Sequence, residues 1–245
     1  MTNHVSPFVE TNIDPLLVEL SSAVELHHAG YEHPLRPALQ HFIRSIFWRA
    51  HRADVSSFYP NLVGFSISDR LRAVVGYRDG CSKSLFSEQY LDVPAHALAA
   101  TRLGLTVERE QMVEVGNLAI LNAGQARWVI AASTSFLAGA GYRWVLFTAT
   151  RPLANAFHRL GLKPMRLGTA DPGRLPDLGK SWGSYYKTGP AVYVGDIHAG
   201  LDKLHRARGA QGSNLVGLLK SAHALGARVA HASEPSRRGL AAAKE

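Results

Sequence analysis

The stretch that decides the fold runs over residues 112–164 and reads MVEVGNLAILNAGQARWVIAASTSFLAGAGYRWVLFTATRPLANAFHRLGLKP. Its alternating start predicts a strand over 111–121, and an apolar side at helical spacing predicts a helix over 125–138. The run YRWVLFTAT predicts a buried strand. Pro152 in a first turn and Gly161 as a C-cap then bound a second helix. This order of elements predicts a mixed α/β sheet with helices on its faces.

The flanking sequence extends the same pattern. Upstream, we expect a helix over 38–52 and two strands, over 62–68 and 72–77, in a hairpin. Downstream, strands are expected over 165–167 and 191–194. The chain therefore divides into a lead-in (1–34), an α/β domain (35–198), a C-terminal amphipathic helical extension (199–234) and a disordered tail (235–245).

The composition is that of a globular protein, with 46% hydrophobic and 19% charged residues in a chain of 245. A single cysteine, Cys81, excludes an internal disulfide framework and a cysteine-based zinc cluster. The histidines lack an HExxH-like pairing, so we predict no metal site. The run 128–142 is too short to cross a bilayer, and we recognise no secretory signal. We therefore expect a cytoplasmic protein.

The net charge of +8 lies mostly at the C-terminus, where eight Lys and Arg residues stand against three acids from Asp202 onward. A basic end attracts nucleic acid, anionic lipid or an acidic protein, and a solvated end is the plain alternative. We expect no specific nucleic-acid partner. An apolar stripe in the same region indicates a helix that docks on the body, binds a partner or lies on a membrane surface. The stripe consists of Leu215, Leu218, Leu219, Ala222, Leu225 and Val229.

Four short motifs in order resemble the family called thermostable hemolysin: LFSEQYLD (85–92), VEVGNLA (113–119), FTAT (147–150) and WGSYY (182–186). The resemblance covers roughly residues 35–198. The central stretch also resembles the GNAT acyltransferase fold, in which a bulged strand feeds a helix whose N-terminus receives the phosphates of the acyl carrier. The family is itself similar to the acyl-homoserine-lactone synthases, which take acyl chains from acyl-carrier protein.

The resemblance implies a GNAT-like N-acyltransferase. It would move a fatty acyl group from an acyl-carrier-protein or acyl-CoA thioester to a small amine or an amino-acid-derived acceptor. Acyl-phosphopantetheine would be a co-substrate, with no tightly bound cofactor. Asn117 stands where the synthases have an arginine, so their amine substrate is not carried over.

Glu114 matches a glutamate on the bulged strand of the synthases. A carboxylate in a partly apolar cleft can take the proton of an ammonium, often through water, so we assign Glu114 as general base. Gly116 and Asn117 follow it, and a glycine within a strand marks a bulge or a close approach by a ligand, so we predict a central sheet that is splayed beside this strand. Backbone N–H groups there would contact the thioester carbonyl. The alternative for Glu114 is an ordinary carboxylate on the solvent face of the strand, and the alternative for Gly116 and Asn117 is a bulge that serves packing alone.

Other residues complete the predicted site. Gly124, Gln125 and Arg127 open the next helix, where a phosphate would bind; the alternative is a turn with an exposed arginine. Phe157 aligns with the catalytic tyrosine of many GNAT enzymes and cannot donate a proton. The neighbouring His158 does not substitute for it, because adjacent helical residues point about 100° apart.

Substrate contacts are assigned to three further groups. Arg78, in a Gly76-Tyr77-Arg78 element like the G-x-R of the synthases, and Glu88 would orient the acceptor or pair with each other. The pantetheine arm would meet Thr148, Thr150 and Asn155, although Asn155 also suits local helix capping. Aromatic residues after the Gly/Pro-rich loop would wall an acyl tunnel or belong to the core, namely Trp182, Tyr185 and Tyr186.

Two other functions compete with acyl transfer. One is a membrane-active, hemolysin-like protein with a peripheral membrane contact through the basic C-terminal helix. The other is a non-catalytic GNAT-like module that binds acyl-carrier protein or nucleic acid through its basic surface. No G-x-S-x-G, Walker loop or Rossmann glycine set points to another enzyme class.

Overall fold

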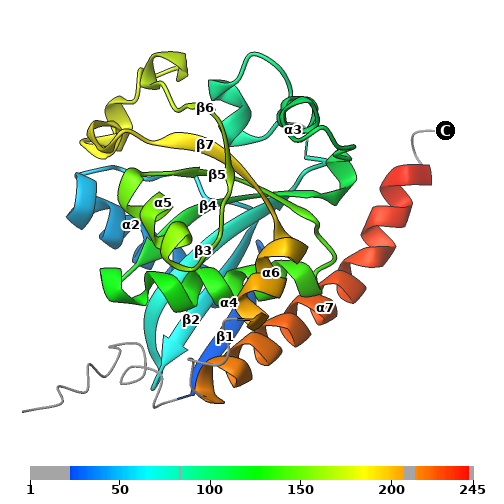
Figure 1. The fold of residues 1–245 in the computed structure, drawn as a ribbon. Helices are drawn as coiled ribbons and strands as arrows, with labels where there is room; N and C mark the ends of the chain where they lie inside the picture. The colour runs from blue at the N-terminus through cyan, green and yellow to red at the C-terminus, as the bar shows by residue number, and fades with distance from the viewer. Residues whose placement is uncertain (1–22, 83, 207–212, 243–245) are drawn as a thin grey trace, which may run out of the picture.

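A seven-stranded sheet organises the part of the chain that the computed structural model describes, residues 23–82, 84–206 and 213–242. The strand order is β1-β2-β3-β4-β5-β7-β6, and helices lie on both faces (Figure 1). The predicted mixed α/β sheet is confirmed. Its strands are β1 Val24–Ala29, β2 Asn61–Ile67, β3 Arg70–Asp79, β4 Met112–Ile120, β5 Trp144–Ala149, β6 Met165–Thr169 and β7 Ala191–Asp196.

Neighbouring strands pair antiparallel except β4 and β5, which are parallel. β1 was not predicted, because its sequence VELHHA carries polar residues on both sides of the strand. Its backbone pairs with β2, and His27 Nε2 hydrogen-bonds Ser66 Oγ at 2.9 Å. The sheet thus starts before residue 35. Residues 1–22 of the lead-in lie outside the described part.

Six helices accompany the sheet in the described residues, and those predicted upstream of residue 165 are confirmed to within two residues at each end. α7 continues past residue 234, where we expected the disordered tail to begin, and residues 243–245 lie outside the described part. The helices are α2 Arg36–His51, α3 Ala95–Leu103, α4 Ala126–Gly139, α5 Arg151–Arg159, α6 Ile197–Arg206 and α7 Ser213–Ala242.

α4 is the central helix of one face of the sheet. Its Trp128 and Phe136 are buried against Phe65, Val75 and Val113 of the strands. α7 crosses α4 from outside, as Figure 1 shows, and buries the predicted apolar stripe on the body. The expected docking is confirmed. Burying such a stripe is the main source of stability for a surface helix.

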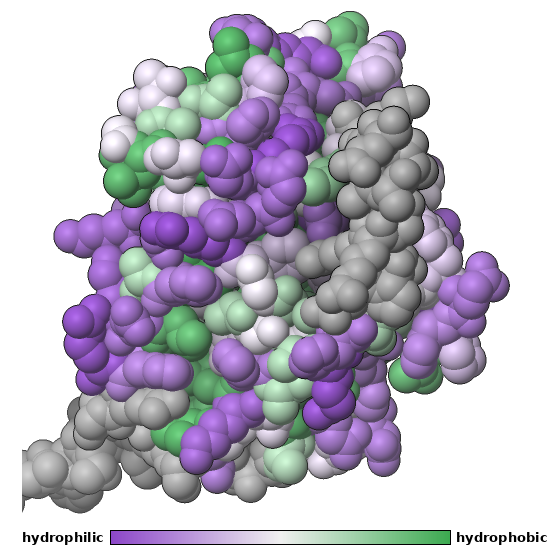
Figure 2. Space-filling view, turned by 90° about the vertical axis from the view of Figure 1, so that its right-hand side faces the viewer, coloured by the Kyte–Doolittle hydropathy of each residue, from purple (hydrophilic) through white to green (hydrophobic). Residues whose placement is uncertain are grey.

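Figure 2 shows one side of the molecule on which hydrophilic residues surround small, separate hydrophobic patches. Within the described residues, none of the helices combines the length and the apolarity that crossing a membrane requires.

The sheet opens between β4 and β5. The two strands pair from Met112↔Trp144 to Val115↔Phe147, and β4 then runs on to Ile120 without β5. Opposite, the β3–β4 register shifts between Val74 and Gly76, and Asn117 adopts a left-handed φ of 48°. The splay that we predicted from the Gly116 interruption is confirmed.

Candidate functional site

A cavity of about 800 Å³ runs through this opening. On the α4 face it is lined by Ile130, Leu137 and Gly200, and on the opposite face by Tyr59 and Phe86. Because side chains from both faces line one cavity, the cavity must pass between the separating strands. Its middle is formed by Val115, Gly116, Asn117, Phe147 and Thr148.

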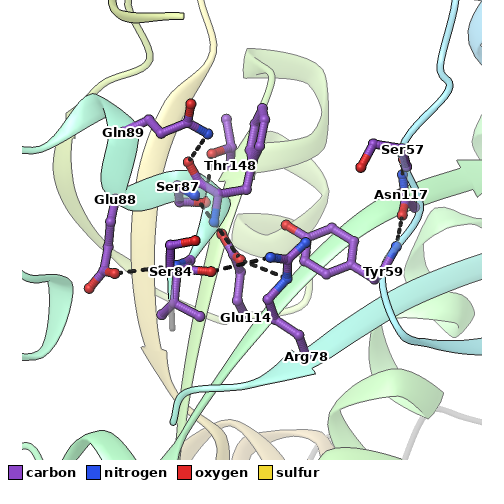
Figure 3. Close-up of polar contacts among 12 residues, drawn as sticks. Ser57, Tyr59, Arg78, Ser84, Ser87, Glu88, Gln89, Glu114, Asn117 and Thr148 are labelled. Atoms are coloured by element: carbon purple, nitrogen blue, oxygen red, sulfur yellow. Dashed lines mark hydrogen bonds and ion pairs between the residues drawn. The ribbon is translucent and has the colours of Figure 1, made fainter. Parts of the chain in front are cut away.

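Glu114 lies just behind the wall of this cavity. Its side chain is fully buried and is not among the lining residues. The backbone N–H groups of Phe86 and Ser87 donate to it at 2.8 and 2.6 Å, and Arg78 Nε lies 3.5 Å away (Figure 3). Burial raises the pKa of Glu114 above its ordinary value, although these donors and the Arg78 charge oppose the shift. The solvent-facing alternative is therefore wrong.

Tyr59 connects Glu114 to the cavity. Its ring lies beneath the Arg78 guanidinium, 4.2 Å from the centroid, and against Gly116. A Cβ at position 116 would lie 2.7 Å from Tyr59 Oη, so only glycine admits the ring. Burial and then the Glu114 charge raise the pKa of Tyr59 well above its ordinary value. The sequence pattern around Phe58-Tyr59-Pro60 had indicated only the end of a helix.

The Asn117 side chain holds the segment before β2 in place. Its Oδ1 accepts a hydrogen bond from the Tyr59 N–H at 2.8 Å, and its Nδ2 donates to the Ser57 carbonyl at 3.3 Å. Arg36 fixes the same segment by donating to the carbonyls of Tyr59 and Pro60, at 2.7 Å each. The amide of Asn117 thus positions Tyr59, and only its backbone is left to meet a ligand.

Arg78 and Glu88 do not pair with each other, so that alternative is wrong. Arg78 lines the cavity and lies beside Glu114, whereas Glu88 is absent from the lining. The Glu88 carboxylate accepts from Arg109 at 2.6 and 2.9 Å and from the Ala95 N–H at 2.9 Å. Burial would raise the pKa of Glu88, but these hydrogen bonds outweigh it and lower the pKa. Sequence reasoning missed Arg109, because 21 residues separate the two partners.

The Glu88–Arg109 pair should make stability sensitive to acid. A carboxylate whose pKa is lowered on folding stabilises the fold above its unfolded pKa, about 4.3, and loses this as the pH falls. The free energy of unfolding, measured with urea, should therefore fall more between about pH 5 and 3 for wild type than for Glu88→Gln. Glu110→Gln, at an exposed neighbour, is the control and should follow wild type. Parallel pH curves for wild type and Glu88→Gln would contradict this role.

The three residues predicted to contact the pantetheine arm all belong to the cavity wall. Thr148, Thr150 and Asn155 all line it. Thr150 caps α5 by accepting from the Leu153 N–H, so Asn155, in the middle of the helix, is not the cap. Thr148 Oγ1 lies 3.1 Å from Ser87 Oγ.

The residues predicted to bind a phosphate at the start of α4 do not themselves line the cavity, although their neighbours do. Ala123 and Ala126 line it, while Gly124, Gln125 and Arg127 do not. Gln125 is fully buried, and Arg127 is half-buried in the first turn of α4. The N-terminus of α4 therefore borders the cavity through Ala123 and Ala126.

An aromatic wall forms another part of the cavity lining. Trp182 lies 5.3 Å from Tyr185 and 6.0 Å from Phe47 between ring centroids, and His51 lies 5.3 Å from Tyr185. All three predicted wall residues, Trp182, Tyr185 and Tyr186, line the cavity. Burial raises the pKa of Tyr185, and it raises the pKa of Tyr186 to about 12, so both phenols stay neutral. Phe157 stacks on Phe147 at 4.8 Å within the same cavity, and His158 is exposed.

Comparison with solved structures finds the same fold in an acyl-homoserine lactone synthase, in an N-acyl amino acid synthase and in TofI. BjaI, a CoA-dependent acyl-homoserine lactone synthase solved with SAM and isopentyl-CoA, matches with a TM-score of 0.51 and 17% identity, over 80% of this chain and 99% of its own. FeeM, an N-acyl amino acid synthase from uncultured soil microbes, matches with a TM-score of 0.51 and 12% identity, over 77% and 98%. TofI, solved in a ternary complex with an inhibitor and MTA, matches with a TM-score of 0.50 and 15% identity, over 74% and 96%.

At these identities the likeness establishes the GNAT-like fold of the chain and nothing finer. No curated protein matches the chain in sequence. The family described as thermostable hemolysin matches residues 29–201, which is more than half of the sequence. The chain therefore belongs to the thermostable hemolysin family.

Proposed function

We propose that this protein is an N-acyltransferase that moves a fatty acyl group from a thioester to a small amine. The observation that carries the proposal is the buried Glu114 carboxylate directly behind a cavity that crosses the sheet at the β4–β5 opening. The opening admits an extended thioester, and the α4 side supplies apolar lining for an acyl chain. A nearby carboxylate supplies the base that an ammonium acceptor requires.

The two sides of the cavity suit different substrates. The acyl chain lies on the α4 side, among Ile130, Leu137 and Gly200, and the phosphopantetheine arm lies along Thr148 and Asn155. The acceptor, a small amine or an amino-acid derivative, lies between Arg78 and the aromatic wall that includes Trp182 and Tyr185. Glu88 is held by Arg109 and acts on the acceptor only through the loop that it braces.

Catalysis in this proposal uses β4 at its bulge. Glu114 is the general base, acting through an intervening group because its own side chain does not reach the cavity. Backbone N–H groups of Gly116 and Asn117, beyond the last β5 pair, contact the thioester carbonyl and stabilise its developing negative charge. No tightly bound cofactor is required. Because acyl-thioesters of carrier protein and CoA are cytoplasmic metabolites, the proposed reaction is a cytoplasmic one.

Mass spectrometry of lipid extracts tests the proposal. Cells that express wild type should contain an N-acyl amide that is missing from cells expressing equal amounts of folded Glu114→Gln. The same extracts identify the acyl chain and the acceptor. Identical extracts from both strains and from cells without the protein would contradict acyl transfer.

The membrane-active alternative has its own test. The stripe of α7 is buried on the body, so between residues 214 and 232, whose side chains the structure describes, the helix offers its polar side, with Lys220 and Arg228, for a peripheral membrane contact. In the proposal, hemolysis by an overproducing strain comes from an acylated amphiphile that the enzyme makes. Lysis of erythrocytes by purified protein without substrates would overturn this and favour a toxin.

The salt dependence of KM tests whether the acyl donor is an acyl-carrier protein. An acidic acyl-carrier protein is steered by basic residues near the entrance, with Arg127 as the first candidate. We expect the KM for acyl-carrier protein to rise about tenfold from low to physiological salt and on Arg127→Glu. Arg143→Glu, at an exposed arginine beyond the other end of α4, is the control. A KM insensitive to both salt and Arg127→Glu would contradict this carrier docking.

A further inference from the structure

Proton transfer at this site has to cross a gap, because the Glu114 side chain has no exposed surface and does not line the cavity. A base must come within hydrogen-bond reach of the proton that it removes, directly or through one intermediary. A lining group in contact with Glu114 must therefore stand between the carboxylate and the acceptor.

Three lining side chains meet Glu114. Arg78 lies 3.5 Å away, but a guanidinium does not give up its proton in a protein. Ser87 hydrogen-bonds Glu114, and its hydroxyl also lies 3.1 Å from Thr148 Oγ1. The Tyr59 hydroxyl faces Glu114, its ring shares the Arg78 guanidinium with that carboxylate, and it lies at Gly116, where β4 leaves β5. Of the two hydroxyl groups, that of Tyr59 lies at Gly116, whose N–H the proposed function assigns to the thioester carbonyl, so Tyr59 is the better placed to meet the acceptor.

The surroundings of Tyr59 are built to hold this hydroxyl still. Asn117 and Arg36 bind its backbone N–H and carbonyl, and Arg78 covers its ring. The charged and titratable groups that face its hydroxyl are Arg78 on β3, Glu114 on β4, Tyr185 in the turn Tyr185–Thr188 and Tyr90 in the turn Phe86–Tyr90. Three separate contacts, two at the backbone and one on the ring, position the Tyr59 oxygen without the entropy cost of ordering a mobile side chain.

We propose that Tyr59 is the catalytic group that meets the acceptor amine and relays its proton to Glu114. This inference rests on the proposed N-acyltransferase function. The ammonium gives one proton to Tyr59 Oη while the Tyr59 O–H proton passes to the Glu114 carboxylate. The neutral amine attacks the thioester carbonyl carbon, the C–N bond forms, and the C–S bond breaks. The second nitrogen proton leaves with the thiolate as a thiol. The Glu114 proton returns through Tyr59 to water in the cavity.

Kinetics of purified Tyr59→Phe test the relay. The probes are decanoyl-CoA with either 2-phenylethylamine, which is protonated at neutral pH, or hydroxylamine, whose nitrogen is already neutral. With 2-phenylethylamine, the kcat of Tyr59→Phe should be about 10²-fold below that of wild type. This loss should become smaller as the pH rises, and also when hydroxylamine is used in place of 2-phenylethylamine. Adding Tyr59→Phe to Glu114→Gln should cost little more, because both act in one relay.

Controls separate this role from a structural one. Tyr77→Phe removes another buried tyrosine hydroxyl, bonded to His28 at 3.0 Å and outside the cavity lining, and should behave as wild type with both amines. A Tyr59→Phe defect equal for both amines at every pH would overturn the relay. A pH-dependent defect in Ser87→Ala, with none in Tyr59→Phe, would overturn it in favour of Ser87.

A measurement without turnover distinguishes the relay from the proposed function. The Glu114 carboxyl band, assigned with Glu114→Gln, can be titrated by infrared spectroscopy. Loss of the Tyr59 donor should raise the pKa of Glu114, since a hydrogen bond to the charged form lowers it. An unchanged titration would overturn the relay whatever the activity. If wild type acylates neither amine, the proposed function has failed, while the titration still decides whether Tyr59 is coupled to Glu114.

Discussion

Glu114→Gln is expected to lower kcat for acyl transfer by about 10²- to 10⁴-fold, the usual loss when a general base is removed. Glutamine keeps the shape of the side chain and can still accept a hydrogen bond from Phe86 or Ser87, whose N–H groups bind Glu114 at 2.8 and 2.6 Å. The loss should therefore lie in turnover. Steady-state kinetics with purified protein, together with thermal unfolding, provide the measurement.

The pH dependence gives the same variant a second signature. A base works only when deprotonated, and burial raises the pKa of Glu114, so wild-type kcat should rise with pH through a value above that of an ordinary carboxylate. Glu114→Gln should lack this rise, and its rate should recover at alkaline pH, where more of the amine is already neutral.

The matched control for Glu114→Gln is Glu88→Gln. It makes the same chemical change in a partly buried carboxylate of the same region, but one bound to Arg109 and absent from the cavity lining. The kcat of Glu88→Gln should stay within about tenfold of the wild-type value. Near-normal turnover in folded Glu114→Gln would show that Glu114 is structural.

Gly226→Ala is expected to destabilise the fold by about 2–3 kcal/mol. Gly226 lies where α7 crosses α4, and a Cβ there would collide with the Phe136 carbonyl oxygen and lie 2.8 Å from the Ala140 nitrogen. Both obstacles are backbone, so they cannot rotate away. Ser135 Oγ, which donates to the Leu219 carbonyl at 2.7 Å, would be pulled from its partner if the helices separated. Urea unfolding measures the loss.

Gly217→Ala is the paired control in the same helix. A Cβ at Gly217 meets nothing within 4 Å, so alanine should stabilise α7 by about 0.5–1 kcal/mol through its better helix propensity. Opposite signs for the two variants would locate the α4–α7 contact at Gly226. Equal effects would mean that α7 does not pack closely on α4 in solution.

The order of elements was readable from the sequence because it depends on local patterns. The alternation before Gly116, the apolar side of α4 and the Thr150–Pro152 start of α5 each act within a few residues. β1 escaped prediction for the same reason: its pairing with β2 satisfies backbone groups whatever the side chains, so an edge strand with two histidines carries little pattern.

For the candidate site, local patterns in the sequence were enough to place Glu114 and Gly116 on one strand and Thr148 on the next. That the three residues meet where β4 and β5 separate, and which side chains surround them, follows from the folded structure. It brought Ser87, 27 residues from Glu114, onto the carboxylate, and it placed Tyr59 against Gly116. It also assigned the Asn117 amide to holding the Tyr59 backbone, 58 residues away. Such partners are chosen by packing of the whole chain, because a hydrogen bond between distant residues requires the folded sheet to bring them within about 3 Å.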